Sequence, residues 1–276
     1  MPRLIIHTAK LTQEQSQELE ATYGQPIQQA NAHYIDTNQP VDRQQLSDLS
    51  TRLKLDINPL PDGFDPTKVK LVISDMDSTL ISIECIDEIA DMMNLKPQVS
   101  EITEAAMRGE LNFEQSLTQR VGLLKGLDTA ALQRVYDERL TLNPGAQACL
   151  TGLKHKGVKF ALVSGGFDFF TDRLKQSLAL DFARANKLAI DANQLSGLVE
   201  GKIIGAQAKA DFLLELCQTL NITPNQVIAI GDGANDLLMM AQAGLSIAYH
   251  AKPKVQQQAD CAFNYSGLDA ILDFID

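Results

Sequence analysis

The chain has 276 residues, of which 45% are hydrophobic and 21% are charged, a composition typical of a globular protein with one large domain and room for a small second one. Its formal net charge of −11 argues against nucleic acid or an anionic membrane as a partner. No apolar run reaches the roughly 18–20 residues of a membrane span, and the first residues are too polar for a signal peptide, so we expect a cytoplasmic protein.

The first 57 residues predict a small α+β unit. We expect strands at residues 4–6 and 32–36 and helices at residues 13–22 and 43–53. Residues 58–66, rich in Pro, Gly and Asp, are interpreted as a linker. The unit carries no group of site residues, which favours a role in packing or in forming a homodimer.

After the linker, short apolar strands alternate with helices, which is typical of a parallel α/β sheet. Such strands are expected at residues 70–74, 159–163, 227–230 and 245–249, with a weaker one at 261–264. The runs at residues 71–73 and 227–230 are apolar without alternation, as expected for strands that are covered on both faces. Residues 185–190 and 198–203 predict a β-hairpin with its turn at residues 191–194.

About 80 residues separate the first two of these strands, and most of them predict helices. The expected helices lie at residues 86–93, 101–108, 113–124 and 128–139. A crossover between parallel strands needs only about a dozen residues. The excess therefore predicts an inserted helical subdomain, at about residues 82–145, that could cap the sheet.

Polar clusters follow three of the expected strands, at the ends where an open parallel sheet binds its ligands. They are Asp75-Met76-Asp77-Ser78-Thr79, Ser164-Gly165-Gly166 and Gly231-Asp232-Gly233-Ala234-Asn235-Asp236. Carboxylates that meet in one crevice repel one another unless a cation joins them, and a site of carboxylate oxygens suits Mg²⁺. Taken one at a time, these aspartates would be read as N-caps of the helices that follow.

The order of these motifs resembles that of the haloacid dehalogenase-like phosphatases. The first cluster is similar to their D-x-D-x-T motif, and Ser164-Gly165-Gly166-Phe167, Lys209 and the third cluster are similar to the other three motifs. The phosphoserine phosphatases within that superfamily are more similar still, over roughly residues 68–276, with matches at Glu84, at residues 112–117 and at Arg120. The resemblance implies a Rossmann-like parallel sheet flanked by helices, with a helical cap, in a domain over residues 67–276. A small N-terminal α+β domain and its linker, over residues 1–66, lie outside the match.

The resemblance also implies roles for the site residues. Asp75 would be the nucleophile that forms an aspartyl-phosphate, and Asp77 would be the general acid and base, with a pKa that neighbouring carboxylates raise. The Mg²⁺ ligands would be the Asp75 carboxylate, the Asp77 backbone carbonyl and Asp232, with Asp236 farther out or bound through water. Ser164, the Gly165 amide and Lys209 would bind the phosphoryl oxygens.

Substrate choice is assigned to the inserted helices by the same resemblance. Glu84 would pair with an ammonium and Arg120 with a carboxylate, and Asn235 would contact the substrate or orient the metal ligands. Met107 and Phe113 would shield the site from water. The implied activity is Mg²⁺-dependent hydrolysis of phosphoserine, the last step of serine biosynthesis. Two alternatives stay open. The enzyme could be a related phosphatase or phosphotransferase for another small phosphorylated metabolite, and the N-terminal unit could be an amino-acid sensor such as some related phosphatases carry.

Overall fold

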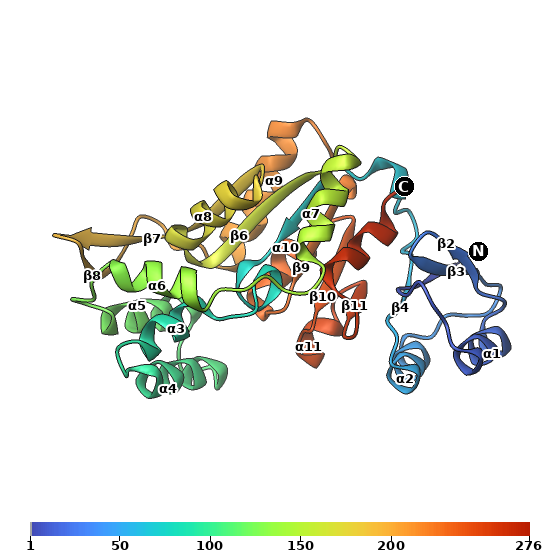
Figure 1. Cartoon of the computed structure of the whole chain (residues 1–276), viewed down its shortest axis with the longest axis horizontal. Coiled ribbons are helices and arrows are strands. Elements are labelled where there is room, and N and C mark those ends of the chain that lie inside the picture. Colours follow the sequence, from blue (N-terminus) through green and yellow to red (C-terminus); the bar gives the residue numbers. More distant parts are fainter. Residues whose placement is uncertain (1) are drawn as a thin grey trace.

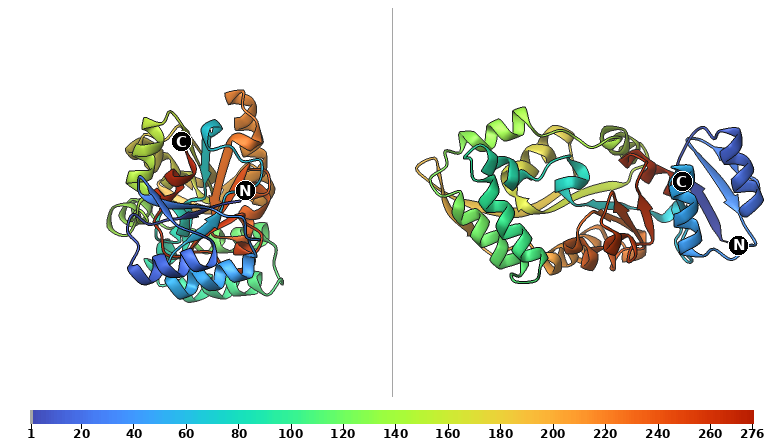
Figure 2. Two further views of the ribbon diagram at one scale, coloured as in Figure 1. Left: turned by 90° about the vertical axis from the view of Figure 1, so that its right-hand side faces the viewer. Right: turned by 90° about the horizontal axis from the view of Figure 1, so that it is seen from below.

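Two β-sheets organise the chain, a seven-stranded sheet in the large domain and a four-stranded sheet near the N-terminus (Figure 1). The structure, a computed structural model, describes residues 2–276 except for the side chain of Met107. The small sheet lies at one end of the molecule and the helices inserted after the first strand of the large sheet lie at the other, as two further views show (Figure 2).

The large sheet has the strand order β11-β10-β9-β5-β6-β7-β8, and all its neighbouring strands are parallel except β7 and β8. The strands are β5 (Leu71–Ser74), β6 (Lys159–Phe167), β7 (Phe182–Asp191), β8 (Gln194–Glu200), β9 (Val227–Gly231), β10 (Leu245–Tyr249) and β11 (Cys261–Phe263). Every residue of β5, β9 and β10 is buried, as predicted for strands covered on both faces. The predicted fold class is confirmed.

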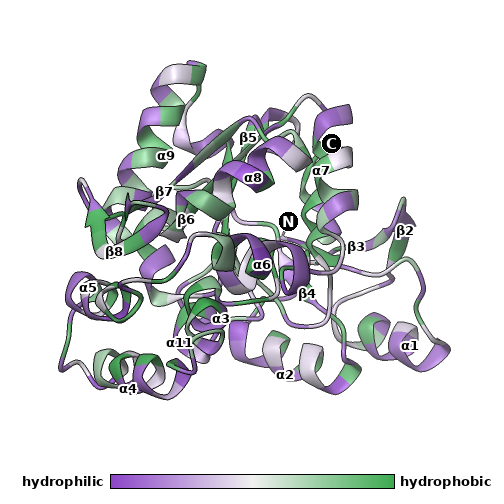
Figure 3. Ribbon diagram, turned by 60° about the vertical axis from the view of Figure 1, so that its left-hand side comes forward, coloured by the Kyte–Doolittle hydropathy of each residue, from purple (hydrophilic) through white to green (hydrophobic). Residues whose placement is uncertain are grey.

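Successive residues of a strand point to opposite faces of the sheet, so both faces of this sheet carry apolar side chains. Helices cover both faces. In β5, Val72 packs into one apolar core while Leu71 and Ile73 pack into the other. The flanking helices are α7 (Ala146–His155), α8 (Asp168–Leu178), α9 (Ala206–Leu220), α10 (Leu237–Met240), α11 (Pro253–Gln256) and the short C-terminal helix η5 (Leu268–Phe274). In Figure 3 most of these helices carry hydrophilic and hydrophobic residues on different sides, as expected for elements with one face on a core.

The insertion between β5 and β6 consists of the helices α3 (Cys85–Asp91), α4 (Lys96–Met107), α5 (Phe113–Leu123) and α6 (Ala130–Glu138). The chain leaves the sheet at Ile81 and returns at Leu142, and these two residues pair in an antiparallel bridge. The side chain of Asn143 donates hydrogen bonds to the carbonyl oxygens of Thr79 and Ile81, at 2.8 and 3.1 Å. The two connections to the sheet are therefore joined to each other.

The β7–β8 hairpin also touches the insertion. The backbone of Leu195 exchanges hydrogen bonds with Gly126 and Leu127, each at 2.8 Å. A hairpin was predicted here, but its second strand begins at Gln194 and not at residue 198. The reason is the turn, which is only two residues long. Ala192 and Asn193 both have positive φ, 47° and 66°, as a tight two-residue hairpin turn requires.

The N-terminal unit is an antiparallel sheet of order β2-β3-β1-β4 with two helices on one face. Its elements are β1 (Arg3–Ile6), α1 (Gln13–Thr22), β2 (Ile27–Gln29), β3 (Ala32–Asp36), α2 (Arg43–Leu53) and β4 (Ile57–Pro59). The start of the expected linker is thus a strand, because Asn58 and Pro59 pair with Ile5 and Leu4. Ile5 and Ala32 belong to the apolar core of the large domain, so the unit packs directly against it. Within residues 2–276, no helix has the length and apolar character needed to cross a membrane.

Candidate active site

Loops at the carboxyl ends of β5, β6 and β9 surround a cavity of about 160 Å³. These three strands are neighbours in the sheet and parallel, so their carboxyl ends meet at one edge. The cavity is lined by side chains of those loops and of the inserted helices: Asp75, Asp77, Glu84, Ile86, Phe113, Leu117, Arg120, Gly165, Gly166, Phe167, Asp232 and Asn235. Ser164 and Lys209 are fully buried and bonded to Asp77 and Asp75. The structure therefore brings these predicted site residues together, whereas the prediction for the Met107 side chain lies outside the described part of the chain.

A larger groove, of about 400 Å³, lies between α2 and the segment around β11. Its acidic side chains are already occupied. Asp56 accepts hydrogen bonds from three backbone amides, and Asp260 accepts from the backbone and hydroxyl of Ser246.

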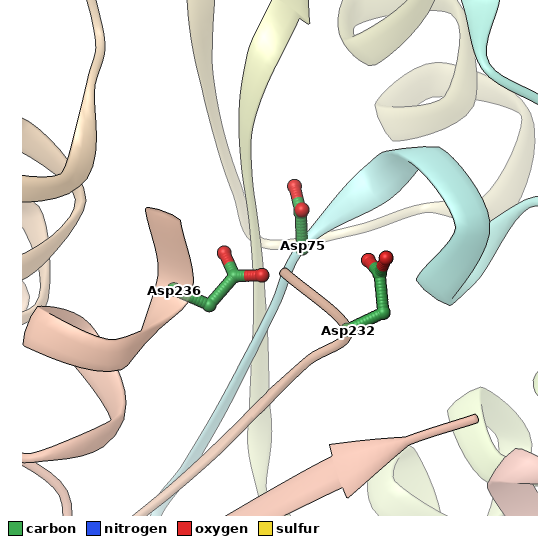
Figure 4. A group of neighbouring side chains, drawn as sticks. All are labelled: Asp75, Asp232 and Asp236. Carbon is green, nitrogen blue, oxygen red and sulfur yellow. The ribbon is translucent and has the colours of Figure 1, made fainter. Parts of the chain in front are cut away.

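Three carboxylates, two that line this cavity and a third that is fully buried beside them, lie close enough to share one cation. The carboxylate oxygens of Asp75, Asp232 and Asp236 lie within 4.8 Å of one another, around a common space (Figure 4). Asp75 follows β5, Asp232 follows β9, and Asp236 comes just before α10. Asp236 was expected farther from the metal, but its carboxylate belongs to the same cluster. Oxygen donors in this number fit a divalent cation such as Mg²⁺.

Lys209 is the one cation that touches this cluster in the described part of the chain. Its Nζ lies 2.7 Å from Asp75 Oδ1 and 2.7 Å from Asp236 Oδ1, and its side chain is fully buried. Burial alone would lower the pKa of Lys209, but the charges of Asp236 and Asp75 raise it. A single ammonium facing three carboxylates leaves an excess of negative charge that a divalent cation would neutralise.

This excess of negative charge raises the pKa values of carboxyl groups in the cluster. Burial raises the pKa of Asp75 well above its usual value, and the charge of Asp236 adds to the effect while Lys209 opposes it. Burial and Asp236 also raise the pKa of Asp232, to about 6, against the hydrogen bond that it accepts from Thr79. Without a bound cation the cluster is an unfavourable place for three negative charges.

Asp77 is held by hydrogen bonds to both of its carboxylate oxygens. Oδ1 accepts from the Cys85 backbone amide at 2.9 Å, and Oδ2 accepts from Ser164 Oγ at 3.1 Å. The pKa of Asp77 is raised, as expected of a general acid, and burial rather than the expected neighbouring carboxylates is its largest cause. The hydrogen bonds from Cys85 and Ser164 oppose the shift.

Ser164, Gly165 and Gly166 were expected to follow a strand, but they form the irregular end of β6, where its register with β7 shifts, and this end is called the glycine loop below. Its two glycines allow close contacts on both sides. A Cβ atom at Gly166 would lie 2.7 Å from Asp77 Oδ2, so a larger residue would push that carboxylate away. A Cβ atom at Gly165 would lie 2.8 Å from the ring of Phe113, the first residue of α5. Phe113 therefore covers this loop from the side of the inserted helices, where it would exclude water.

Glu84 and Arg120 line the side of the cavity formed by the inserted helices. Glu84 Oε1 accepts from Ser78 Oγ at 2.7 Å. Desolvation and the charge of Asp77 raise the pKa of Glu84 to about 7, although the side chain is exposed enough for water to screen part of this effect. Burial lowers the pKa of Arg120, against the charges of Asp87 and Glu84. Within residues 2–276, no carboxylate lies within ion-pair distance of Arg120, so its charge is open to a ligand.

One further contact bears on the carboxylate cluster. Thr79 is fully buried, and its hydroxyl donates to Asp232 Oδ1 at 3.0 Å. This hydrogen bond orients the Asp232 carboxylate. The sequence pattern contained the signal, since Thr79 is the last residue of the D-x-D-x-T motif, but no role was predicted for it.

A parallel sheet whose strand ends carry this aspartate pair, a buried lysine and an acidic cluster under inserted helices is typical of one class of hydrolase. The sequence model described as haloacid dehalogenase-like hydrolase matches residues 69–244, and the chain belongs to this family. It is accordingly an enzyme that hydrolyses its substrate.

Its relatives include named phosphatases. A phosphoserine phosphatase of Polaromonas sp. strain JS666 is 52% identical over 211 residues, which are 75% of this chain and 89% of that protein. A HAD family hydrolase from Salmonella enterica serovar Typhi is 35% identical, with a TM-score of 0.91 over 100% of this chain and 99% of its own. The unliganded structure of a probable phosphoserine phosphatase from Vibrio cholerae is 38% identical, with a TM-score of 0.86 over 99% of this chain and 86% of its own.

Proposed function

We propose that this chain is a phosphoserine phosphatase, which hydrolyses O-phospho-L-serine to serine and inorganic phosphate in a Mg²⁺-dependent reaction. One observation carries the proposal. A single small cavity is lined by Asp75, Asp77 and Asp232 at one side and by the charged groups of Glu84 and Arg120 at the other. Phosphoserine has a phosphate, an ammonium and a carboxylate, and each finds a group of suitable charge in this arrangement. The similarity to curated phosphoserine phosphatases supports the same conclusion.

Substrate binding would depend on the charges of the site residues. The net charge of −11 repels an anionic substrate, so attraction has to come from the site itself. Lys209 and the backbone amide of Gly165 would receive the phosphoryl oxygens. Glu84 would pair with the ammonium, and Arg120 would bind the carboxylate through two parallel hydrogen bonds. Asn235, which lines the same cavity, would contact the substrate.

The metal site would be formed by the Asp75 carboxylate, the Asp77 backbone carbonyl and Asp232, with Asp236 beside them. A bound Mg²⁺ would offset the negative charge of these groups and stabilise the charge that develops on the phosphoryl oxygens. The side chains of Lys209 and Thr79 would keep the carboxylates in place through the contacts described above.

The chemistry would take two steps on the protein's own carboxylates. In the first, Asp75 attacks phosphorus, the bond from phosphorus to the serine oxygen breaks, and Asp77 gives its proton to that oxygen. In the second, Asp77 takes a proton from a water molecule that attacks the aspartyl-phosphate, which releases phosphate and restores Asp75. The raised pKa of Asp77 suits a group that has to carry the proton at the start.

We also propose a cytoplasmic enzyme that completes serine biosynthesis. Its phosphatase domain would span residues 67–276 with the cap at about 82–145, after a small N-terminal domain and linker over residues 1–66. The packing of Ile5 and Ala32 into the core of the large domain supports a stabilising role for the N-terminal unit. Homodimer formation stays a prediction, to be measured by light scattering.

A substrate panel tests the proposal. We expect the highest kcat/KM for O-phospho-L-serine among L- and D-phosphoserine, phosphothreonine, p-nitrophenyl phosphate and a sugar phosphate. Activity should vanish in EDTA and return with excess Mg²⁺. A higher kcat/KM for the sugar phosphate would replace the proposed substrate, and full activity in EDTA would refute the metal role.

A further inference from the structure

Asn186 is a buried polar residue for which the proposed reaction has no use. It lies in β7, and 1% of its surface is exposed. Its side-chain Nδ2 donates to the carbonyl oxygen of Gly165 at 2.8 Å, and its Oδ1 accepts from the backbone amide of Ile204 at 2.7 Å. The side chain thus joins two loops that lie far apart in the sequence, and both loops border the site.

The first hydrogen bond fixes the peptide between Gly165 and Gly166. The Gly165 carbonyl and the Gly166 amide belong to the same rigid plane, so holding one orients the other. The Gly166 amide donates to Ser164 Oγ at 2.8 Å, and the Ser164 hydroxyl donates to Asp77 Oδ2. A continuous series of hydrogen bonds therefore leads from Asn186 to the carboxyl group that would carry the proton.

The second hydrogen bond fixes the start of α9. Ile204 precedes Gly205, the N-cap of that helix, and the Gly205 carbonyl accepts from the Lys209 amide at 3.0 Å. Lys209 in turn bonds to Asp75 and Asp236. The helix that carries the buried ammonium is thereby tied to the glycine loop.

The ring of Phe113 contacts both loops that Asn186 joins. A Cβ atom would lie 2.8 Å from this ring at Gly165 and 3.3 Å from it at Gly205. One aromatic ring can cover both glycines only while the two loops keep their present spacing. Asn186 is hydrogen-bonded to both segments and so helps to fix that spacing.

We infer that Asn186 is a positioning residue for phosphoryl transfer, which holds the Gly165–Gly166 peptide and the Ile204–Gly205 turn in register around Asp77 and Lys209. This inference rests on the proposed phosphatase function. Small displacements of a reacting group can cost roughly 10²-fold in rate. The loss should fall on kcat more than on KM, because Glu84 and Arg120 hold the rest of the substrate from the inserted helices.

The chain provides a matched control in Asn58. This residue is also buried, at 4% exposure, and its Nδ2 donates to the carbonyl oxygen of Ala262 at 3.0 Å. Its Oδ1 accepts from the Ala262 amide at 2.8 Å. The bonding is of the same kind as at Asn186, but it joins β4 to β11 and does not touch the cavity residues.

The experiment compares Asn186→Asp with Asn58→Asp in the full chain with Mg²⁺. Burial raises the pKa of a carboxyl group, so the variants are compared up to a pH at which the introduced group is ionised. The carboxylate then cannot donate to the backbone carbonyl, and both variants should lose thermal stability to a similar degree. With that group ionised, we expect kcat to fall roughly 10²-fold in N186D for both phosphoserine and p-nitrophenyl phosphate, with the KM for phosphoserine within about threefold of the wild type. In N58D, kcat should stay within about twofold, as expected of a site remote from the reaction.

The pH profile gives a readout that a purely structural role would not change. As the pH falls, protonation of the introduced carboxyl restores a donor to Gly165, so the kcat of N186D relative to wild type should rise. An N186D enzyme with wild-type kcat, or an equal loss of kcat in N58D, would overturn the inference. If N186D does not fold, Asn186→Ser removes the long side chain without adding charge and is judged by the same kcat criterion. Failure of the wild type to hydrolyse phosphoserine would instead refute the proposed function.

Discussion

Buried aspartates occur in two regions of this molecule and have opposite surroundings. At the junction with the N-terminal unit, Asp56 is 2% exposed and accepts hydrogen bonds from the backbone amides of Asn264, Tyr265 and Ser266, at 2.8, 2.9 and 2.7 Å. In the cavity, Asp75 and Asp236 share a single lysine, and Asp232 lies in the same cluster. The first carboxylate stands alone and accepts three hydrogen bonds. The three carboxylates of the second group also accept hydrogen bonds, from the Met76 and Gly233 amides and the Thr79 hydroxyl, but they crowd together around a single cation.

This contrast teaches that burial of an acidic residue does not by itself indicate a site. A buried carboxylate is tolerated when hydrogen bonds replace its water, as at Asp56, and it then contributes to stability. Where several carboxylates crowd together around a single ammonium group, the folded chain retains an unfavourable charge that a cation or a substrate can relieve. The crowding of carboxylates separates the two cases, and the first two predictions below test that separation.

The largest expected effect is that of Asp75→Asn. Removing the nucleophile should lower kcat for phosphoserine by at least roughly 10³-fold. The same change should leave the free energy of unfolding in EDTA equal to the wild-type value or higher, because a buried and repelled charge becomes neutral. Steady-state kinetics and urea denaturation measure the two quantities. Wild-type turnover in this variant would end the covalent mechanism.

Asp56→Asn should show the reverse pattern. The new amide group faces backbone N–H donors, so at least one hydrogen bond to a charged acceptor is lost, and we expect a loss of about 2 kcal/mol in the free energy of unfolding. Turnover of the folded enzyme should stay at the wild-type value. A large loss of kcat here would mean that the junction is coupled to the active site, and the contrast between the two regions would fail.

The sequence predicted much of this, for physical reasons that are visible in particular elements. The strand at β9 is a continuous apolar run, and the helix α1 starts at Thr12 with a capping box that its residues specify directly. The site residues were predictable because Asp75, Ser164 and Asp232 stand at or just after strand ends, where the topology of a parallel sheet brings them together.

What the sequence did not reveal depends on contacts between distant segments. Asn186 is a single polar residue in a strand, and its partners at positions 165 and 204 follow only from the fold. Asp56 gave no sign of its role either, since its donors lie more than 200 residues later in the chain. Sequence motifs identified the reacting groups, whereas the structure was needed to find the residues that hold them.

Arg120→Ala extends the comparison to the substrate side of the cavity. A charge-assisted interaction with the substrate carboxylate is worth about 1.5–3 kcal/mol, so kcat/KM for phosphoserine should fall roughly 10- to 100-fold. p-Nitrophenyl phosphate has no carboxylate and should be affected much less. Arg139→Ala is the matched control, because Arg139 is already paired with Glu88 and Asp91 at 2.6 and 2.8 Å. Equal losses for both substrates in R120A would make Arg120 structural.

The smallest expected effect is a pH dependence of substrate binding through Glu84. Its pKa of about 7 lies above the usual 4.5, so the side chain is mostly protonated at pH 6 and mostly ionised at pH 8. Only the ionised form attracts the substrate ammonium, so the KM for phosphoserine should fall as the pH rises across this range, by up to about tenfold.

Dividing by the KM for p-nitrophenyl phosphate removes the titration of the phosphate, which both substrates share. In Glu84→Gln this ratio should not change with pH, and a ratio that still falls would assign the titration to another group. Because Glu84 keeps an exposed surface, added salt should weaken the dependence, as it would not for the fully buried pair of Lys209 and Asp236.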